Sequence, residues 1–275
     1  MNITAKSSQL ILLKLIFLVT FSLFYHASIF AEDSLYERGK QLVELMVGTT
    51  KAYKVNPTAK KPLIVFDSNG HGISLANSDP EFNKSLAEAD IIHADGQSVV
   101  SMSKWTDGPL IPERSATTDT IHDIPTMCSD NVKHFLFGGT KEVVEKCATI
   151  LSVKYPNFHI AGTLSGYFTD AQSNDIVAQI NNSNADILWV GLGKPKEQKW
   201  IIDNKHRLKV PVIITCGGCY NYVTGDYARA PLWMQNAGLE WLHRATTEPK
   251  KFLWRYLTTN PHSIYCVLKH KMKKS

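Results

Sequence analysis

Short apolar runs recur along the chain from residue 62 onward, and amphipathic or polar stretches separate them. The runs at 62–66, 91–92, 134–137, 158–161, 187–190 and 210–215 predict buried strands. Apolar residues at helical spacing predict helices at 34–47, 79–89, 141–155, 175–181 and 197–205, with another that ends near residue 105. This alternation is typical of βαβ units. It predicts an α/β fold, Rossmann-like, with a mostly parallel sheet and helices on both faces.

The predicted strands end in glycines or short polar turns. The exits include Gly138-Gly139, Gly162, Gly191-Leu-Gly193 and Gly217-Gly218. In parallel α/β sheets, ligands bind outside the carboxyl ends of the strands, and a glycine lets the backbone approach a ligand closely. We therefore expect the functional site at these exits.

The stretch Gly191-Leu-Gly-Lys-Pro-Lys196 has the features of an anion site. Pro195 suits a first helical turn, where its missing N–H costs nothing. The free N–H groups of that helix start, together with Lys194 and Lys196, predict a site for a phosphate. The alternative is a plain strand-to-helix turn without a ligand.

Composition is that of a globular protein, with 275 residues, 44% hydrophobic and 20% charged. This length suits one large α/β domain or two small ones. The five cysteines form no dense disulfide framework. Cys216-Gly-Gly-Cys219 lacks the second CxxC of a zinc site, so we interpret these residues as packed thiols, with a redox role as the alternative.

Positive charge is concentrated in the C-terminal tail. Residues 238–275 hold eight Lys or Arg and two Glu, a net +6 in a chain of net +5. Trp241, Phe252, Trp254 and Tyr256 are interleaved with these charges, a composition that favours a membrane interface. A solvated basic end is the alternative. If one helix continues through Pro249, then Arg244, Lys251 and Arg255 fall within about 40° of arc.

An apolar leader occupies residues 10–31, apart from Lys14, His26 and a few hydroxyls. Its stretch 15–31 has 17 residues, which is marginal for a spanning helix and long for the apolar region of a signal peptide, so a signal, an anchor and an interfacial helix all stay open. We therefore divide the chain into a leader at 1–31, a Rossmann-like domain at 32–237 and a basic helical appendage at 238–275, expected to associate with a membrane.

Several motifs, taken together, point to a known family. They are Ala94-Asp-Gly96, Arg114 with Asp119, Phe137-Gly-Gly139, Gly162-Thr-Leu-Ser-Gly-Tyr-Phe168, Val190-Gly-Leu-Gly-Lys-Pro-Lys196, Arg229-Ala-Pro-Leu-Trp-Met-Gln235, Gly238-Leu-Glu-Trp-Leu-His-Arg244, Glu248-Pro249 and Arg255-Tyr-Leu257. In this order they resemble the WecG/TagA/CpsF family of bacterial glycosyltransferases, over about residues 62 to 257.

The resemblance implies transfer of an N-acetylmannosamine-type sugar, or its uronic acid, from a UDP donor to a polyprenyl-diphosphate-linked sugar in cell-surface polysaccharide synthesis. It implies inversion at the sugar and neither a metal nor another cofactor. No two aspartates here are separated by a single residue, which agrees with the absence of a metal clamp. Asp95 matches the family's base. The substrate-binding residues would be Asn69, Arg114, Asp119, Gly138, Gly139, Gly191, Gly193, Lys196, Gln198, Arg229, Arg244, Lys251 and Arg255.

The chain departs from the family pattern at two informative places. Where members read Pro-Lys-Gln-Glu, this chain reads Pro195-Lys-Glu-Gln198, so the amide and the carboxylate are exchanged. Asp67 replaces a threonine and adds negative charge near the expected diphosphate. These changes bear on donor identity and on activity.

Three alternatives stay open. A non-catalytic nucleotide- or sugar-binding relic of the family would bind UDP without turnover. A nicotinamide-dependent oxidoreductase would need GxGxxG after an early strand, whereas Gly191-Leu-Gly193 is late and Lys196 stands at the third glycine position. Nucleic-acid binding by the tail has no supporting motif.

Cellular location is a conflict within the sequence. UDP-sugars are cytosolic, so the catalytic domain is expected at the cytoplasmic face of a membrane, with an anionic membrane surface as a partner. A cleaved or spanning leader would instead export it. Oligomeric state, homo-oligomers included, is not indicated by the sequence.

Overall fold

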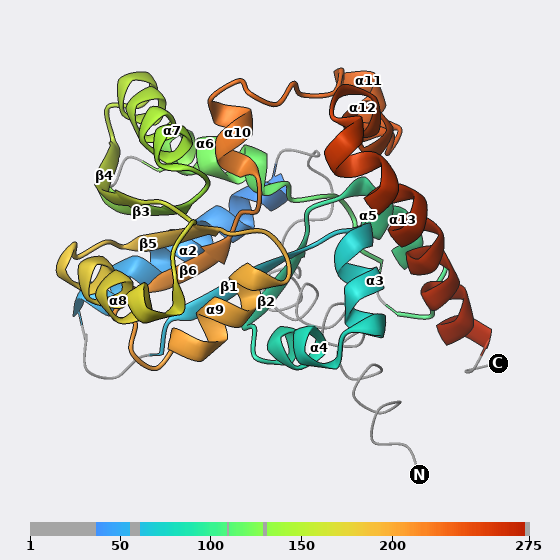
Figure 1. Cartoon of the computed structure of the whole chain (residues 1–275), viewed down its shortest axis with the longest axis horizontal. Helices are drawn as coiled ribbons and strands as arrows, with labels where there is room; N and C mark the ends of the chain where they lie inside the picture. The colour runs from blue at the N-terminus through green and yellow to red at the C-terminus, as the bar shows by residue number, and fades with distance from the viewer. Residues whose placement is uncertain (1–36, 56–60, 109, 129–130, 273–275) are drawn as a thin grey trace, which may run out of the picture. The chain divides into compact units, whose positions relative to one another are not determined.

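A computed structural model describes residues 37–55, 61–108, 110–128 and 131–272 (Figure 1). Six strands form one sheet in the order β2-β1-β6-β5-β3-β4. Their bounds are β1 Leu63–Ser68, β2 Ile91–Ala94, β3 Val132–Gly138, β4 Phe158–Leu164, β5 Ile187–Gly191 and β6 Val212–Thr215. The pairs β1–β6, β6–β5, β5–β3 and β3–β4 are all parallel. The predicted α/β, Rossmann-like fold with a mostly parallel sheet is confirmed.

Helices lie around the sheet (Figure 1). Their bounds are α2 Glu37–Val55, α3 Gly70–Ser78, α4 Pro80–Ala87, α5 Gln97–Ser103, α6 Thr117–Met127, α7 Lys141–Lys154, the 3-10 turn η2 Asp170–Gln172, α8 Ser173–Asn182, α9 Lys196–Asn204, α10 Cys219–Val223, α11 Leu232–Asn236, α12 Glu240–Thr247 and α13 Pro249–Met272. The predicted leader at 1–31 lies outside the described residues.

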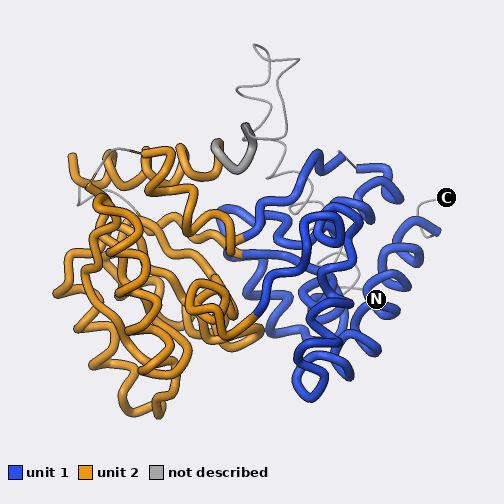
Figure 2. Tube along the Cα trace, turned by 90° about the horizontal axis from the view of Figure 1, so that it is seen from above, with its two compact units in different colours: residues 1–35, 67–116, 228–275 blue, residues 36–66, 117–227 orange. Residues whose placement is uncertain are grey.

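The chain divides into two compact units (Figure 2). The described part of the first unit comes from residues 67–116 and from residue 228 onward, and the second unit comprises 36–66 and 117–227. The predicted division of the chain, with its boundary after residue 237, stays a prediction. Within the first unit, α13 lies against α3, and its side chains Phe252, Tyr256 and Val267 are buried. The Ser74 hydroxyl and His262 Nδ1, 2.8 Å apart, also join these helices.

The core of the second unit is built on three adjacent strands. All residues of β5 and β6 are buried, and Trp189 and Phe137 are fully inaccessible. Burying such large side chains contributes about 2–3 kcal/mol each. His134 is also fully buried, stacks on Phe158 at 3.8 Å between ring centroids, and accepts the Trp189 indole N–H at 3.1 Å. Desolvation lowers the His134 pKa to about 3, with a smaller contribution from His159, so this imidazole is neutral at physiological pH.

Two helix boundaries differ from the sequence predictions. The stretch after β1, expected to be a turn, starts α3, because the Asn69 side chain accepts the Gly72 N–H at 3.1 Å and caps the helix. The single helix considered through Pro249 is instead two helices, α12 and α13. Proline fixes its own φ and disfavours the α conformation in the preceding residue. Accordingly, Glu248 leaves helical geometry at φ −129° and ψ 60°.

Candidate functional site

Asp95 follows β2 directly, in the first unit. Its N–H donates to the carbonyl of Ser68, the last residue of β1, at 2.8 Å. This hydrogen bond holds the turn at Asp95 beside the end of β1, and Asn69 is the next residue after that strand. Gly96 permits this approach, since a Cβ there would lie 3.3 Å from the Asn69 Cβ. The Asp95 side chain is half-buried. Asn69 and Asp95, both predicted site residues, therefore lie at the ends of two neighbouring strands.

Arg114 reaches the same region through its loop. The Ser115 N–H donates to the Ala94 carbonyl at 2.7 Å, which ties residues 114–115 to the end of β2. Nδ1 of His93, on β2, lies 2.7 Å from the Ser115 carbonyl oxygen and holds the loop from the other side. The backbone thus joins the Asp95 turn to the loop that carries Arg114.

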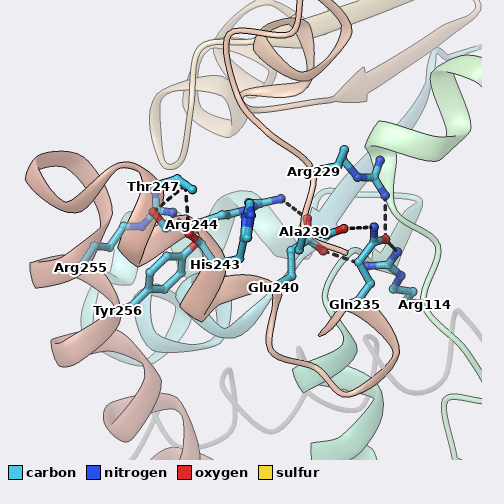
Figure 3. A network of polar contacts seen from close by, with 10 residues as sticks. All are labelled: Arg114, Arg229, Ala230, Gln235, Glu240, His243, Arg244, Thr247, Arg255 and Tyr256. Atoms are coloured by element: carbon cyan, nitrogen blue, oxygen red, sulfur yellow. Dashed lines mark hydrogen bonds and ion pairs between the residues drawn. The ribbon is translucent and has the colours of Figure 1, made fainter. Parts of the chain in front are cut away.

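Arginines dominate a polar network in the first unit (Figure 3). Arg114 donates from one terminal nitrogen to Glu240 at 2.9 Å and from the other to Gln235. Arg229 donates to the same Gln235 oxygen at 2.9 Å, and Arg244 donates to Glu240 at 2.8 Å. Gln235 also donates to the Ala230 carbonyl at 2.7 Å, so that its amide is held at both ends.

Figure 3 draws Arg114, Arg229, Arg244 and Arg255 in one view with the carboxylate of Glu240. Arginine side chains gathered in this way favour a nearby anion. The two terminal nitrogens of Arg114, a predicted substrate-binding residue, contact Gln235 and Glu240. Sequence reasoning did not assign a role to Gln235 or Glu240, although both lie in motifs that carried the resemblance.

Arg255 and Lys251 lie on α13, apart from the helix that carries Arg244. The Arg255 guanidinium packs over the rings of Phe252 and Tyr256, at 4.6 and 5.0 Å from their centroids, and donates to the Tyr256 hydroxyl at 3.3 Å. Lys251 is exposed. The predicted 40° alignment with Arg244 is wrong, because it required one helix through Pro249.

Glycines of the second unit pack backbone against backbone at the strand exits. Gly138 has φ +149°, and a Cβ there would lie 2.3 Å from the Gly191 carbonyl oxygen. The Gly139 N–H donates to that same oxygen at 3.2 Å. At Gly191, a Cβ would meet the Gly217 carbonyl oxygen and the Tyr220 ring, both at 2.9 Å. These glycines are thus required by the packing of neighbouring loops as well as being predicted ligand contacts.

Glu197, which follows the predicted anion site, changes the interpretation of that site. It is fully buried, and its Oε2 accepts the N–H groups of Gly193 at 3.0 Å and Gly217 at 3.2 Å. The N–H of Gly193, a predicted substrate-binding residue in the loop before α9, therefore donates to the protein's own carboxylate. Gln198 is also fully buried and donates to Glu197 at 3.4 Å. Its predicted role in substrate binding stays a prediction. Lys196, the first residue of α9, is exposed.

The remaining predicted residue, Asp119, lies in the first turn of α6. Burial raises the pKa of Asp123, one turn further on, to about 6, and the charge of Asp119 contributes to the rise. Asp119 thus acts on a neighbouring carboxyl group in its own helix.

The CxxC cysteines are packed thiols. Cys216 and Cys219 are free and buried. Burial raises the pKa of Cys216 well above its usual range, and the charges of Cys219 and Glu197 add to the rise. A thiol with a raised pKa is a poor nucleophile at neutral pH, which disfavours the redox alternative. In the part of the chain that the structure describes, no group of three or more His, Cys, Asp or Glu side chains is placed to hold a metal ion.

A parallel sheet with glycines and polar side chains at its carboxyl ends defines an α/β protein of Rossmann type. The model of the glycosyl transferase WecG/TagA/CpsF family matches residues 46–275, and the chain belongs to this family. It is 32% identical over 200 residues to the N-acetylglucosaminyldiphosphoundecaprenol N-acetyl-beta-D-mannosaminyltransferase of Bacillus subtilis (strain 168), covering 72% of this chain and 76% of the relative.

A second relative has the same name and comes from Bacillus spizizenii (strain ATCC 23059 / NRRL B-14472 / W23). It is 29% identical over 197 residues, which cover 71% of this chain and 75% of that protein. The resemblance found in the sequence is thereby confirmed. The protein is a glycosyltransferase, and the nicotinamide-dependent alternative is set aside.

Proposed function

We propose that this glycosyltransferase moves an N-acetylmannosamine-type sugar, or its uronic acid, from a UDP donor to a polyprenyl-diphosphate-linked sugar. The names of the two relatives support the acceptor and the sugar type. The observation that carries the proposal is Asp95, half-buried beside Asn69 at the carboxyl ends of two adjacent strands. A carboxylate in this position suits general-base chemistry on a hydroxyl group.

In the proposed reaction, Asp95 accepts the proton of the acceptor hydroxyl. The hydroxyl oxygen then forms a bond to the anomeric carbon as the bond from that carbon to the UDP oxygen breaks, which inverts the configuration. Asn69 orients a sugar hydroxyl near Asp95. The negative charge of the departing diphosphate is stabilised by cationic side chains, without a metal ion. The arginine network supplies that positive charge, and Glu240 and Gln235 hold its members in place.

We assign donor binding to the glycine strand ends of the second unit, at Gly138, Gly139, Gly191 and Gly193. At Gly193, which has φ +78°, a Cβ would meet no atom within 4 Å. This open side of the loop can accept a ligand even though the Gly193 N–H faces Glu197. Lys196 is exposed at the start of the next helix and adds a positive charge.

Helix α13 supports the proposed contact with an anionic membrane. One side packs on α3, while Leu253, Trp254, Leu257, Ile264 and Leu268 are exposed, with Trp254 76% and Leu257 58% accessible. At 100° per residue, these five positions fall within about 100° of arc. Lys250, Lys251, Lys269 and Lys271 lie on the same helix. An apolar stripe with flanking lysines suits a helix that lies in a membrane interface. Within the described residues, no helix is long and apolar enough to span a bilayer.

A transfer assay tests the proposed function. Purified full-length protein is mixed with radiolabelled UDP-N-acetylmannosamine and a short-chain prenyl-diphospho-N-acetylglucosamine, with and without EDTA. We expect the label in the lipid product, with inverted anomeric configuration and an unchanged rate in EDTA. Binding of UDP without transfer to any prenyl-linked acceptor would instead support the non-catalytic relic. Loss of activity in EDTA would contradict the metal-free mechanism.

A further inference from the structure

A single buried carboxylate joins two of the glycine loops at the strand ends. Glu197 Oε2 accepts from Gly193, in the loop after β5, and from Gly217, in the loop after β6. Both glycines have positive φ, +78° and +50°, and a Cβ at either would meet no atom within 4 Å. Each loop therefore presents an open outer side while its N–H points inward to the same oxygen atom.

The partners of Glu197 explain why the carboxylate is tolerated there. Burying an anion is costly unless hydrogen bonds compensate it, and two backbone N–H groups and the Gln198 side-chain amide, at 3.4 Å, do so here. These donors are of the kind that cradle phosphates in other α/β proteins, because backbone N–H groups at a strand end and helix start attract anions. In this chain the protein supplies the anion itself.

We propose that Glu197 is a positioning residue of the donor site, which holds the loops after β5 and β6 and keeps the donor's phosphates off their N–H groups. The inference rests on the proposed function in that it takes the donor to be a nucleoside diphosphate sugar bound at these loops. The nucleoside and the sugar then contact the open sides of the loops, and the diphosphate is held by cationic side chains.

The neighbouring Gln198 allows the negative charge of Glu197 to be removed by a substitution that keeps the hydrogen bonds. Gln198 Oε1 is buried and has no hydrogen-bond partner, while its Nε2 faces Glu197 Oε1. In Glu197→Gln, the new oxygen can accept both backbone N–H groups, and the new NH₂ can donate to Gln198 after that amide turns over. The geometry is kept and only the negative charge is removed. Glu197→Ala removes both, and Glu142→Gln, at an exposed position on α7, is the matched control for net charge.

Amide exchange measures the holding role without any ligand. The chain has 16 glycines, so the full-length protein labelled with ¹⁵N-glycine gives a spectrum in which Gly193 and Gly217 can be assigned by substitution. We expect both N–H groups to exchange slowly in the wild type and in Glu197→Gln, and at least about tenfold faster in Glu197→Ala. Equal exchange in wild type and Glu197→Ala would overturn the holding role.

Titration of the same samples with UDP and with uridine measures the charge effect. A like charge within roughly 10 Å of the phosphates weakens binding about tenfold. We therefore expect Glu197→Gln to bind UDP about tenfold more tightly, with uridine affinity unchanged, and Glu142→Gln to behave as the wild type. Unchanged UDP affinity, or an equal change for UDP and uridine, would overturn the phosphate-excluding role. If the wild type binds no UDP, the proposed donor and this role both fail, while amide exchange still decides the holding role.

Discussion

Removing the Glu240 carboxylate is expected to destabilise the arginine network by a measurable amount. Glu240 contacts Arg114 at 2.9 Å and Arg244 at 2.8 Å, and the three side chains are only 17%, 18% and 24% exposed, in the order Arg114, Glu240, Arg244. Exposed ion pairs contribute about 0–1 kcal/mol, whereas breaking a fully buried one costs about 3–5 kcal/mol. For this intermediate burial we expect Glu240→Ala to lower the free energy of unfolding by about 2 kcal/mol, or roughly 6 °C in Tm.

Urea unfolding followed by circular dichroism tests this value, with a double-mutant cycle of Glu240→Gln and Arg114→Met to isolate the pair. The expected coupling energy is about 1 kcal/mol. The control is Glu145→Ala, which removes an exposed pair with Lys141 at 4.0 Å and should change stability by less than about 0.5 kcal/mol. A Glu240→Ala protein as stable as the wild type, or an additive cycle, would refute the role given to this network.

Three further predictions follow from other parts of the molecule. Trp254→Ser with Leu257→Ser should reduce co-flotation with vesicles containing anionic lipid several-fold while Tm stays within about 2 °C, because both side chains are exposed; unaltered flotation would count against the membrane role of α13. The buried His134 is neutral in the folded protein but takes up a proton on unfolding at any pH between about 3 and 6.5. The free energy of unfolding of the wild type should therefore fall by up to about 1.4 kcal/mol for each pH unit as the pH drops through this window. His134→Gln should lack this contribution when urea titrations at pH 6 and pH 5 are compared. Gly138→Ala should lower the free energy of unfolding by more than about 3 kcal/mol, because the new Cβ would overlap a carbonyl oxygen. Gly193→Ala should lower it by only about 1–2 kcal/mol, because its Cβ meets no atom and only the positive φ is strained. Equal losses of stability in the two variants would contradict the packing described at the strand exits.

The sheet could be predicted from sequence because its strands are short apolar runs that end at glycines. The run at 187–190 became the fully buried β5, and the run at 134–137 became the middle of β3. A strand buried on both faces needs apolar side chains on both, so its pattern is continuous and hard to confuse with a loop. The helices between strands were found for a related reason, since α4, α7, α8 and α9 each bury apolar side chains at helical spacing.

Helix α6 was missed because its local signal is weak. It spans Thr117–Met127, begins with two threonines and contains Pro125. These residues have low helix propensity, so tertiary packing of the fully buried Ile121 and Ile124 stabilises the helix. Asn69 was interpreted as a turn for a similar reason, because asparagine is common both in turns and at helix N-caps.

The candidate site shows where sequence reasoning ends. The residue types at the strand ends and in the basic tail were found, but their partners were not. Of the adjacent Glu197 and Gln198, no periodic pattern says which accepts from the loops, and both turned out to be buried. Likewise, Arg114 was predicted as a substrate-binding residue, but its contact with Glu240, 126 residues later in the chain, was not predicted. Such long-range pairs depend on the fold and have no local signature.

Replacing Asp95 by asparagine tests the central claim most directly. Asparagine keeps the size of the side chain but cannot accept a proton from the acceptor hydroxyl, and loss of a general base slows reactions by about 10²–10⁴-fold. We expect Asp95→Asn to transfer sugar to the prenyl-linked acceptor at least about 100-fold more slowly, while its Tm and its UDP affinity stay close to those of the wild type. A variant that transfers sugar at the wild-type rate would contradict the account.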